Sequence, residues 1–461
     1  MPLKDQGPRP RVLFINRSYW PDAESTGQLL TELCEDLADR FEVTVLAGQP
    51  NQNPDQVAFR RRGPERRNGV TIRRVRHTRF PKRFLVGRLV NYLSFLLGAL
   101  VAALRMPLPD VVVTESDPPL LALIGRVLQR RGGKLVVYLL DIHPDIAVAM
   151  GKLRDGRMVR GLQRILHRVY RGADRIVTPG RDMQQRIARA GIDAGEITVL
   201  PNWIDTTLVR PVKDNNGFRQ RHGLAGRFLV MYSGNLGLCQ QLGDIIAAAG
   251  HLRHRPEILF VLVGDGALKA SLEEQVRQLG LTNIRFFPYE PKSRLAESLS
   301  AADVHLVPLD PRVADCLMPS KLYGVLASGT PLVAIAPEDC ELAQLTRTDR
   351  LGAVAPPGQP EALADVLQAM HDRQADLAAM GRRARQLAEQ SFDRRQITAR
   401  FGDLLYDVLG NPEPSATRPE TPSLIPVHHQ SAEARAIPPP EAARYKGPED
   451  RSLRLILTNA I

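Results

Sequence analysis

Short apolar runs rich in β-branched residues alternate with longer amphipathic runs through the first half of the chain. Strands are predicted at RVLFIN (11–16), EVTVLAG (42–48), DVVVTES (110–116) and KLVVYLLD (134–141). Helical periodicity follows the first and third runs, in TGQLLTELCEDLADRF and LLALIGRVLQRRG. Near-continuous apolar strands separated by helices are typical of a parallel sheet covered on both faces. The pattern therefore predicts a doubly wound α/β domain over residues 10–205.

The second half repeats this plan over residues 206–390. Strands are predicted at 227–237, 257–266, 284–291, 303–309 and 331–337, each but the last leading into a helical stretch. Two such domains place a binding cleft between the carboxyl ends of their sheets. Residues 391–410 have apolar positions at helical spacing and predict a terminal helix that returns to the first domain.

The composition changes after Gly410. Residues 411–461 contain nine prolines, six Lys/Arg and six Asp/Glu, with little periodicity of either kind. Such a segment cannot bury enough apolar surface to fold alone, so we expect a disordered tail.

The net charge of +12 is concentrated in one block. Between Arg60 and Arg88 there are twelve Lys/Arg and one acid, Glu65, which leaves the remainder of the chain at about +1. Sixteen residues without a charge follow, Leu89 to Leu104. This stretch is either a buried core helix or a helix lying in a membrane surface, since a spanning helix needs about 20 apolar residues.

In the membrane interpretation, residues 60–105 form a membrane-facing element. Its cations would contact lipid phosphates: Arg73, Arg74, Arg76, Arg79, Lys82, Arg83 and Arg88. Nucleic acid is the weaker alternative, because the block has few aromatic residues to stack on bases. The N-terminus has no long apolar leader, and the four cysteines form no CxxC pair. We therefore expect a cytoplasmic protein without a metal site.

Three motifs of the second half combine a strand end, glycines and a helix start. The first, YSGNLGLCQQLGDII, contains Gly234, Asn235, Gly237 and Gln240; the second, VLVGDGALKASLEE, contains Gly264 and Asp265. Glycines let a ligand approach the backbone, and N–H groups at a helix start attract anions. Each motif alone also fits an ordinary strand–turn–helix connection.

The third motif, MPSKLYGVLASGTP, places Ser320 at a helix start, where it could cap the helix, and Lys321 in the first turn. A cation there opposes the helix dipole, which is better explained if an anion also binds. In the first half, VYLLDIHPDIA places Asp141 and His143 just beyond a strand end. Asp141 would either lie in the cleft, as residues beyond the strand ends of a doubly wound domain do, or cap the next helix. Glu115 is a third candidate, or a turn residue.

Together these motifs resemble glycosyltransferase family 4, the retaining nucleotide-sugar transferases with the two-domain GT-B fold. The resemblance runs from about Arg11 to Leu409 and includes NRSYWPDAESTGQLLTELCEDLA and VLPNWID. PSKLYGVLASGTP and DIHPDIAVAMG resemble a bacterial branch that builds surface polysaccharides on a polyprenyl-diphosphate carrier, including N-acetylfucosaminyl transferases. The resemblance implies a nucleotide-sugar donor, no cofactor and no metal. The donor residues that it implies are Gly27, Gly234, Asn235, Gly237, Gln240, Gly264, Asp265, Tyr289, Ser320 and Lys321.

This sequence departs from the wider family at four positions. Asn235 and Gln240 stand where many members have Arg and Lys, and Cys316 and Gly324 stand where many have two glutamates. The resemblance then leaves Lys321, with backbone N–H groups, to stabilise the leaving diphosphate. Asp315 or the backbone would bind the ribose. It also implies that Asp141 faces the acceptor hydroxyl or the donor sugar, with His143 as the second choice.

The sequence therefore predicts a glycosyltransferase that moves a sugar, most simply from a UDP-sugar, to a lipid-linked or polysaccharide acceptor. We expect it at the inner face of the plasma membrane, held there by peripheral contact with anionic lipid. Two alternatives are a UDP-sugar 2-epimerase on the same fold and a non-catalytic protein that binds a nucleotide-sugar or a lipid. The missing glutamates favour the second of these, and the basic block argues against the first.

Overall fold

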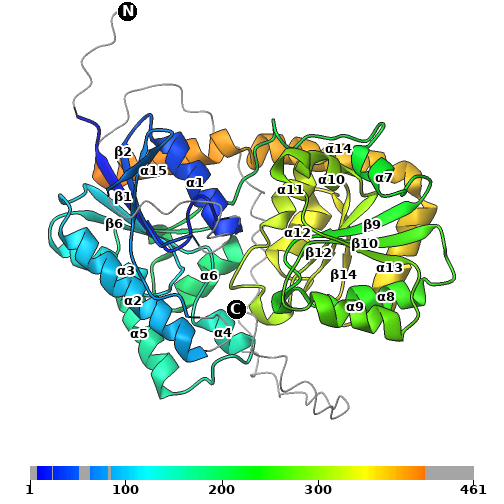
Figure 1. The fold of residues 1–461 in the computed structure, drawn as a ribbon, viewed down its shortest axis with the longest axis horizontal. Helices are drawn as coiled ribbons and strands as arrows, with labels where there is room; N and C mark the ends of the chain where they lie inside the picture. The colour runs from blue at the N-terminus through cyan, green and yellow to red at the C-terminus, as the bar shows by residue number, and fades with distance from the viewer. Residues whose placement is uncertain (1–7, 23, 51–62, 81–84, 411–461) are drawn as a thin grey trace, which may run out of the picture.

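The computed structural model describes residues 8–22, 24–50, 63–80 and 85–410. The chain forms two α/β domains that lie side by side (Figure 1). The predicted architecture of two doubly wound domains is confirmed. The tail 411–461 lies outside the described residues, as do Lys82 and Arg83.

The N-terminal domain contains an eight-stranded sheet in the order β3-β4-β2-β1-β5-β6-β7-β8. All neighbours are parallel except the β3–β4 pair. The strands are β1 (Arg11–Asn16), β2 (Glu42–Ala47), β3 (Glu65–Arg67), β4 (Val70–Arg74), β5 (Val111–Thr114), β6 (Lys134–Tyr138), β7 (Arg175–Thr178) and β8 (Ile197–Val199).

Alternate residues of these strands face opposite sides, so two hydrophobic layers form. Leu13 and Ile15 of β1 lie in one layer, and Val12 and Phe14 lie in the other. The first layer is covered by α2 (Leu85–Leu104), α3 (Leu121–Arg130), α5 (Arg157–Tyr170) and α6 (Arg181–Arg189). The second is covered by α1 (Ser25–Leu37) and the chain's last described helix, α15 (Arg394–Leu409). A short helix, α4 (Asp145–Ala149), follows β6.

The C-terminal domain contains a six-stranded parallel sheet in the order β11-β10-β9-β12-β13-β14. Its strands are β9 (Phe228–Ser233), β10 (Ile258–Val263), β11 (Ile284–Phe287), β12 (Val304–Pro308), β13 (Leu332–Ile335) and β14 (Gly352–Ala355). Its helices are α7 (Gly217–Arg221), α8 (Gly243–His251), α9 (Lys269–Gln278), α10 (Leu295–Ser300), α11 (Lys321–Ala327), α12 (Glu341–Thr348), α13 (Pro360–Asp372) and α14 (Gln374–Ser391).

Helix α2 has one packed side and one exposed side. Phe95, Ala99 and Ala103 are fully buried against the sheet. The opposite side exposes Val86, Leu89, Val90, Leu93, Leu97, Val101 and Leu104. By length and composition, Val86–Leu104 is apolar enough to cross a membrane, and little of it is buried. The core-helix interpretation is therefore wrong for the outer side, because no described part of the chain covers it.

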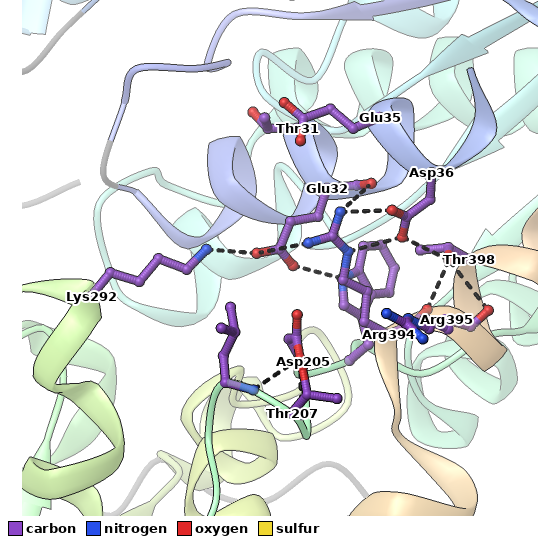
Figure 2. A network of polar contacts seen from close by, with 12 residues as sticks. Thr31, Glu32, Glu35, Asp36, Asp205, Thr207, Lys292, Arg394, Arg395 and Thr398 are labelled. Carbon is purple, nitrogen blue, oxygen red and sulfur yellow. Dashed lines mark hydrogen bonds and ion pairs between the residues drawn. The ribbon is translucent and has the colours of Figure 1, made fainter. Parts of the chain in front are cut away.

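The chain crosses between the domains at two neighbouring points. The first lies just after Trp203, where Ile204 N donates to Phe392 O at 3.0 Å; at the second, Arg394 N donates to Ile204 O at 2.9 Å. Figure 2 shows the polar network beside these crossings, in which the Arg394 guanidinium contacts both carboxylate oxygens of Asp36, at 2.7 and 2.9 Å. Helix α15 is thereby fixed beside α1, and both helices cover the second hydrophobic layer.

The same network receives one residue from the body of the C-terminal domain. Lys292 Nζ lies 2.7 Å from Glu32 Oε1 on α1 (Figure 2), and Trp203 Nε1 donates to the other oxygen of Glu32 at 3.1 Å. The two domains are thus linked by side chains as well as by the crossing strands.

Candidate active site

The strand order of the C-terminal sheet reverses between β9 and β12. Strands β10 and β11 extend to one side of β9, and β12 to β14 extend to the other. At such a switch point the loops leaving the carboxyl ends diverge, and ligands of open α/β sheets bind there. Here the two loops are Gly234–Gln241 after β9 and residues 309–320 after β12.

The glycine motifs come together at this point. Gly234 has φ +151° and Gly264 has φ +152°, values that favour glycine. A Cβ added at Gly264 would collide with the Gly234 carbonyl oxygen, so the two loops touch through their backbones. Leu236 N donates to Asp265 O at 2.9 Å, and Tyr232 Oη donates to Asn235 O at 2.6 Å. The loop after β9 is therefore fixed by the backbone of the loop after β10 and by the Tyr232 hydroxyl.

Lys321 points its amine toward this loop. Its Nζ lies 5.0 Å from the centre of the Tyr232 ring, and its Cε lies 3.0 Å from where a Gly234 Cβ would be. Burial lowers the pKa of Lys321 to about 8. Among the described residues no carboxylate forms an ion pair with it. A desolvated amine without a counter-ion, beside exposed backbone, is suited to receive an anion.

Ser320 occupies the position before α11 but makes no capping bond. Its backbone is already helical, at φ −60° and ψ −25°, so its side chain does not accept from the first turn. The expected cap is therefore wrong, because capping needs an extended backbone at that position. The Ser320 side chain is exposed beside Lys321.

The amides of the first loop are placed differently from one another. Asn235 is exposed, whereas Gln240 and Gln241 are half-buried and each has an Oε1 with no hydrogen-bond partner. Gln241 has a left-handed backbone, and α8 begins two residues later, at Gly243. Gly237 is tightly packed, since a Cβ there would lie 2.8 Å from Asn235 Nδ2.

Tyr289 and Asp265 lie at the open rim of this loop cluster. Asp265 is exposed and accepts from Gly266 N at 2.8 Å. Tyr289 is half exposed beside it, and burial of the other half of the ring raises the pKa of Tyr289. An exposed aromatic ring at a ligand rim offers a stacking surface for a flat base.

Cys316 and Gly324, which stand where many family members have glutamates, both pack inside the C-terminal domain. Cys316 is fully buried, and its Sγ donates to Asp315 Oδ1 at 3.3 Å. Gly324 lies on the buried side of α11, where a Cβ would lie 3.1 Å from Leu299 Cδ1. Asp315, the expected ribose ligand, is bonded instead to Arg186 at 2.8 Å. Cys316 and Gly324 have no carboxylate to offer a ligand, and the carboxylate of Asp315 is already paired with Arg186.

In the N-terminal sheet the order reverses between β1 and β5, and acidic residues follow β5 and β6. Glu115 is 2% exposed and neither of its oxygens has a hydrogen-bond partner. Burial raises the pKa of Glu115 well above its usual range, and the Asp117 and Asp141 carboxylates add to the rise. Asp117 itself pairs with Arg17 at 2.8 Å. Glu115 is thus a buried group and not a turn residue.

Asp141 lies where the two domains meet. Helix α4 begins at Asp145, with Pro144 before it, so the alternative that Asp141 caps a helix is wrong. Burial raises the pKa of Asp141; nearby His143 opposes the rise, and Asp117 adds to it. Asp141 forms a backbone bridge with Leu317 of the other domain, and Ile142 N donates to Cys316 O at 3.0 Å. The acceptor-side and donor-side candidates are thereby brought together.

Gly27, the donor residue expected from the first domain, lies in the first turn of α1, the helix that follows β1. It is buried in α1, and a Cβ there would make ordinary contacts with Ser18 and Asp22. A larger residue would therefore fit at this position, so packing against the loop after β1 does not require a glycine.

The arginines predicted to contact the membrane differ in their exposure to solvent. Arg74 is only 5% exposed, pairs with Glu65 at 3.6 Å and donates to the Trp20 carbonyl, so its prediction as a lipid contact is wrong. Arg73, Arg76 and Arg79 are exposed, and Arg88 is half-buried with a bond to Tyr92.

A second set of arginines was missed by the sequence reasoning. Five exposed residues on or just after α5 follow one helical stripe: Arg157, Arg160, Arg164, Arg168 and Arg171. Met158, 80% exposed, and Ile165 lie next to this stripe. Figure 1 shows α2, α3 and α5 beside one another on the same side of the domain. The spacing of three and four residues was a readable signal.

Comparisons with known proteins agree with this architecture. Residues 26–203 match the family described as glycosyl transferase 4-like domain, and residues 214–387 match glycosyl transferases group 1. WcaI of Escherichia coli (strain K12), named as a colanic acid biosynthesis glycosyl transferase, is 28% identical over 87% of this chain and 100% of its own length.

Two solved structures share the fold. Alr3699/HepE of Anabaena, in complex with UDP and glucose, is 18% identical with a TM-score of 0.64, over 86% of this chain and 99% of its own. Sucrose-phosphate synthase of Thermosynechococcus elongatus is also 18% identical, with a TM-score of 0.71, over 87% of this chain and 100% of its own. With both domains matched in order, the chain belongs to the GT-B glycosyltransferases and is a glycosyltransferase enzyme.

Proposed function

We propose that the protein transfers a sugar, with retention, from a UDP-sugar to a lipid-linked or saccharide acceptor in surface-polysaccharide synthesis. The single observation that carries this proposal is the buried Lys321 amine at the switch point of the C-terminal sheet, which pairs with no carboxylate of the described residues. The name of WcaI, which mentions colanic acid biosynthesis, supports a role in polysaccharide synthesis. The UDP bound in HepE supports a UDP-sugar as the donor.

In the proposed reaction the acceptor hydroxyl oxygen bonds to the anomeric carbon from the face that the diphosphate leaves. The hydroxyl proton passes to the departing phosphate oxygen, so charge and protons balance without a strong protein base. Lys321 and the backbone N–H groups near Gly234 stabilise the negative charge that develops on the diphosphate. Asp141 orients the acceptor hydroxyl from the other domain. We expect no metal or cofactor, and this stays a prediction.

The acceptor would be reached at a membrane surface through the outer side of α2. Its exposed apolar stripe would enter the interface between headgroups and acyl chains. The α5 arginines lie on the same side of the domain, and each would add about 1 kcal/mol on anionic lipid. Exposed Arg73, Arg76 and Arg79 would extend this cationic border.

The test of the reaction is UDP release by the purified protein over a panel of UDP-sugars. Each donor is assayed with and without short-chain polyprenyl-diphosphate sugars and free oligosaccharides. Release that depends on one donor–acceptor pair supports the transferase and identifies the sugar. UDP binding without release from any pair would favour the non-catalytic alternative. A 2-epimer formed without acceptor would favour the epimerase.

The membrane proposal has its own test. Flotation with vesicles of phosphatidylglycerol and phosphatidylcholine compares wild type with the double variant Leu93→Glu/Leu97→Glu. Leu279→Glu, an equally exposed leucine in the other domain, is the matched control. Loss of binding in the double variant alone is expected; equal binding by all three proteins would contradict the proposal.

A further inference from the structure

The loop that precedes Lys321 is attached to the opposite domain. Its backbone bridges the segment after β6, through Asp141 with Leu317 and through the 3.0 Å bond from Ile142 N to Cys316 O. Lys321 lies four residues after this bridge. If the bridge broke, the segments that carry the two groups assigned to transfer could move relative to each other.

One guanidinium fixes the bridge from the side. Arg186 of α6 bonds Asp315 Oδ2 of the C-terminal domain at 2.8 Å through Nη1. Through Nη2 it bonds Asp145 Oδ1 of the N-terminal domain at 2.6 Å. Asp315 is two residues before Leu317, and Asp145 is four residues after Asp141. Both bonds can form together only while the two loops are in contact.

The first turn of α6 is also engaged with the C-terminal domain. Arg181 N donates to Glu341 Oε2 at 2.6 Å, and Glu341 N donates to Asp182 Oδ2 at 2.7 Å. The N-termini of α6 and α12 thus exchange carboxylates. Gly180 permits this approach, because a Cβ there would lie 2.6 Å from Glu341 Oε2. Helix α6 is therefore already aligned with the second domain before Arg186 makes its two bonds.

We propose that Arg186 is a positioning residue that holds the acceptor-side Asp141 in register with the donor-side Lys321 during sugar transfer. The proposal rests on the proposed function. Arg186 does not contact the reacting atoms; it acts through the two loops that carry them. Asp315, in the loop after β12, thereby helps to align the two domains instead of binding a ligand.

The physical reason is that transfer needs two substrates from two domains, whereas binding of UDP needs only one domain. Without Arg186, Asp145 and Asp315 lose their shared cation and the loops separate. A misplacement of about 1 Å at reacting atoms can cost about 100-fold in rate. The bound donor is then attacked by water: the water oxygen bonds to the anomeric carbon, and its proton leaves with UDP.

The experiment compares Arg186→Met and Arg186→Lys with wild type and with Arg189→Met. Arg189 is an exposed arginine on the same helix, three residues further on. Four quantities are measured: UDP affinity, kcat for transfer, the KM for each substrate, and donor hydrolysis without acceptor. For Arg186→Met we expect UDP affinity within about 2-fold of wild type, kcat lower by 10- to 100-fold, and a higher ratio of hydrolysis to transfer. Arg186→Lys should recover part of kcat, and Arg189→Met should match wild type.

Asp315→Ala is the second variant, in case Arg186→Met does not fold. It removes the bond from Arg186 to the C-terminal domain and leaves the bond to Asp145, so we expect kcat to fall with retained UDP affinity, and wild-type kcat in this variant would also overturn the proposal. Wild-type kcat and hydrolysis ratio in a folded Arg186→Met protein would overturn the proposal. A loss of UDP affinity as large as the loss of kcat would overturn it too, because it would indicate direct contact with the donor.

Amide hydrogen exchange separates this failure from a failure of the proposed function. With saturating UDP, the Ile142 amide, which donates to Cys316 O across the bridge, should exchange faster in Arg186→Met than in wild type, whether or not the correct acceptor is known. Equal exchange in the two proteins would overturn the positioning role, and an absence of turnover in wild type would concern only the proposed function.

Discussion

Replacement of Lys321 by methionine should stabilise the free protein while impairing its reaction. Burial lowers the pKa of Lys321 from 10.5 to about 8, and no described carboxylate pairs with it. At about 1.4 kcal/mol per pKa unit, the charged amine costs the folded state about 3 kcal/mol. Partial exposure of the side chain reduces this to about 2 kcal/mol. Lys321→Met removes that cost and keeps a similar volume.

The sign of the pH dependence follows from proton binding. Between about pH 8 and pH 10.5 the unfolded chain holds a proton on this lysine that the folded protein has released. The free energy of unfolding contributed by Lys321 therefore rises with pH across this window. Lys321→Met should be more stable than wild type by about 2 kcal/mol at pH 7, with the difference lost by pH 10. At pH 8.5 the Lys321 amine of the free protein is mostly neutral, and a bound diphosphate would favour its charged form. UDP binding should therefore be accompanied by proton uptake in wild type and not in Lys321→Met.

The assays are thermal unfolding between pH 7 and pH 10, and calorimetric titration of UDP in buffers of different ionisation enthalpy. A gain of about 2 kcal/mol corresponds to a rise in Tm of about 4 to 8 °C for a domain of this size. Lys134→Met, which removes an exposed lysine paired with Asp174, is the control and should shift Tm little. We expect turnover of Lys321→Met to fall by about 100-fold or more.

Two outcomes would refute this reasoning. If Lys321→Met were less stable than wild type at pH 7, the amine would have a stabilising partner in the folded protein. If wild type bound UDP without proton uptake, the diphosphate would not lie near Lys321.

Three further results are expected. Gly264→Ala should destabilise the protein by about 2 kcal/mol or more in denaturant unfolding and weaken UDP binding, because its Cβ would displace the Gly234 carbonyl; an unchanged midpoint would show that the loops are slack. Arg394→Met should lower Tm by removing the paired bonds to Asp36, more than removal of an exposed arginine does, and an equal effect would place the network's stability elsewhere. Burial raises the pKa of Glu341 to about 7, so wild-type Tm should fall from pH 5 to pH 8 as this carboxyl ionises, while Glu341→Gln should flatten the fall; parallel curves would exclude Glu341 as the cause.

The strands and the glycine loops were predictable because local rules fix them. Apolar β-branched runs form buried parallel strands in almost any α/β context, and Gly234 and Gly264 mark loops at strand ends. Because β10 is the neighbour of β9 in the sheet, the glycine loops that follow these two strands meet. The strands and loops thus depend on residues close in sequence and on strand pairing.

Contacts between distant residues could not be predicted in the same way. Arg186 gives no local sign that it bonds Asp315, 129 positions away in the other domain. Arg74 belongs to a basic block, yet its own strand position turns it toward Glu65 and main-chain carbonyls. Helix α2 is apolar on nearly all sides, so periodicity did not distinguish its packed side from its exposed side.

The paired crossing strands have a mechanical consequence for the whole molecule. A single tether would let the domains swivel and twist freely, but Ile204 is bonded to both Phe392 and Arg394, so two tethers run side by side. Twisting would shear these bonds, whereas bending about the pair leaves them intact. The paired strands therefore favour bending of the domains over twisting. The contacts of α6 with the C-terminal domain then limit how far the domains can bend apart.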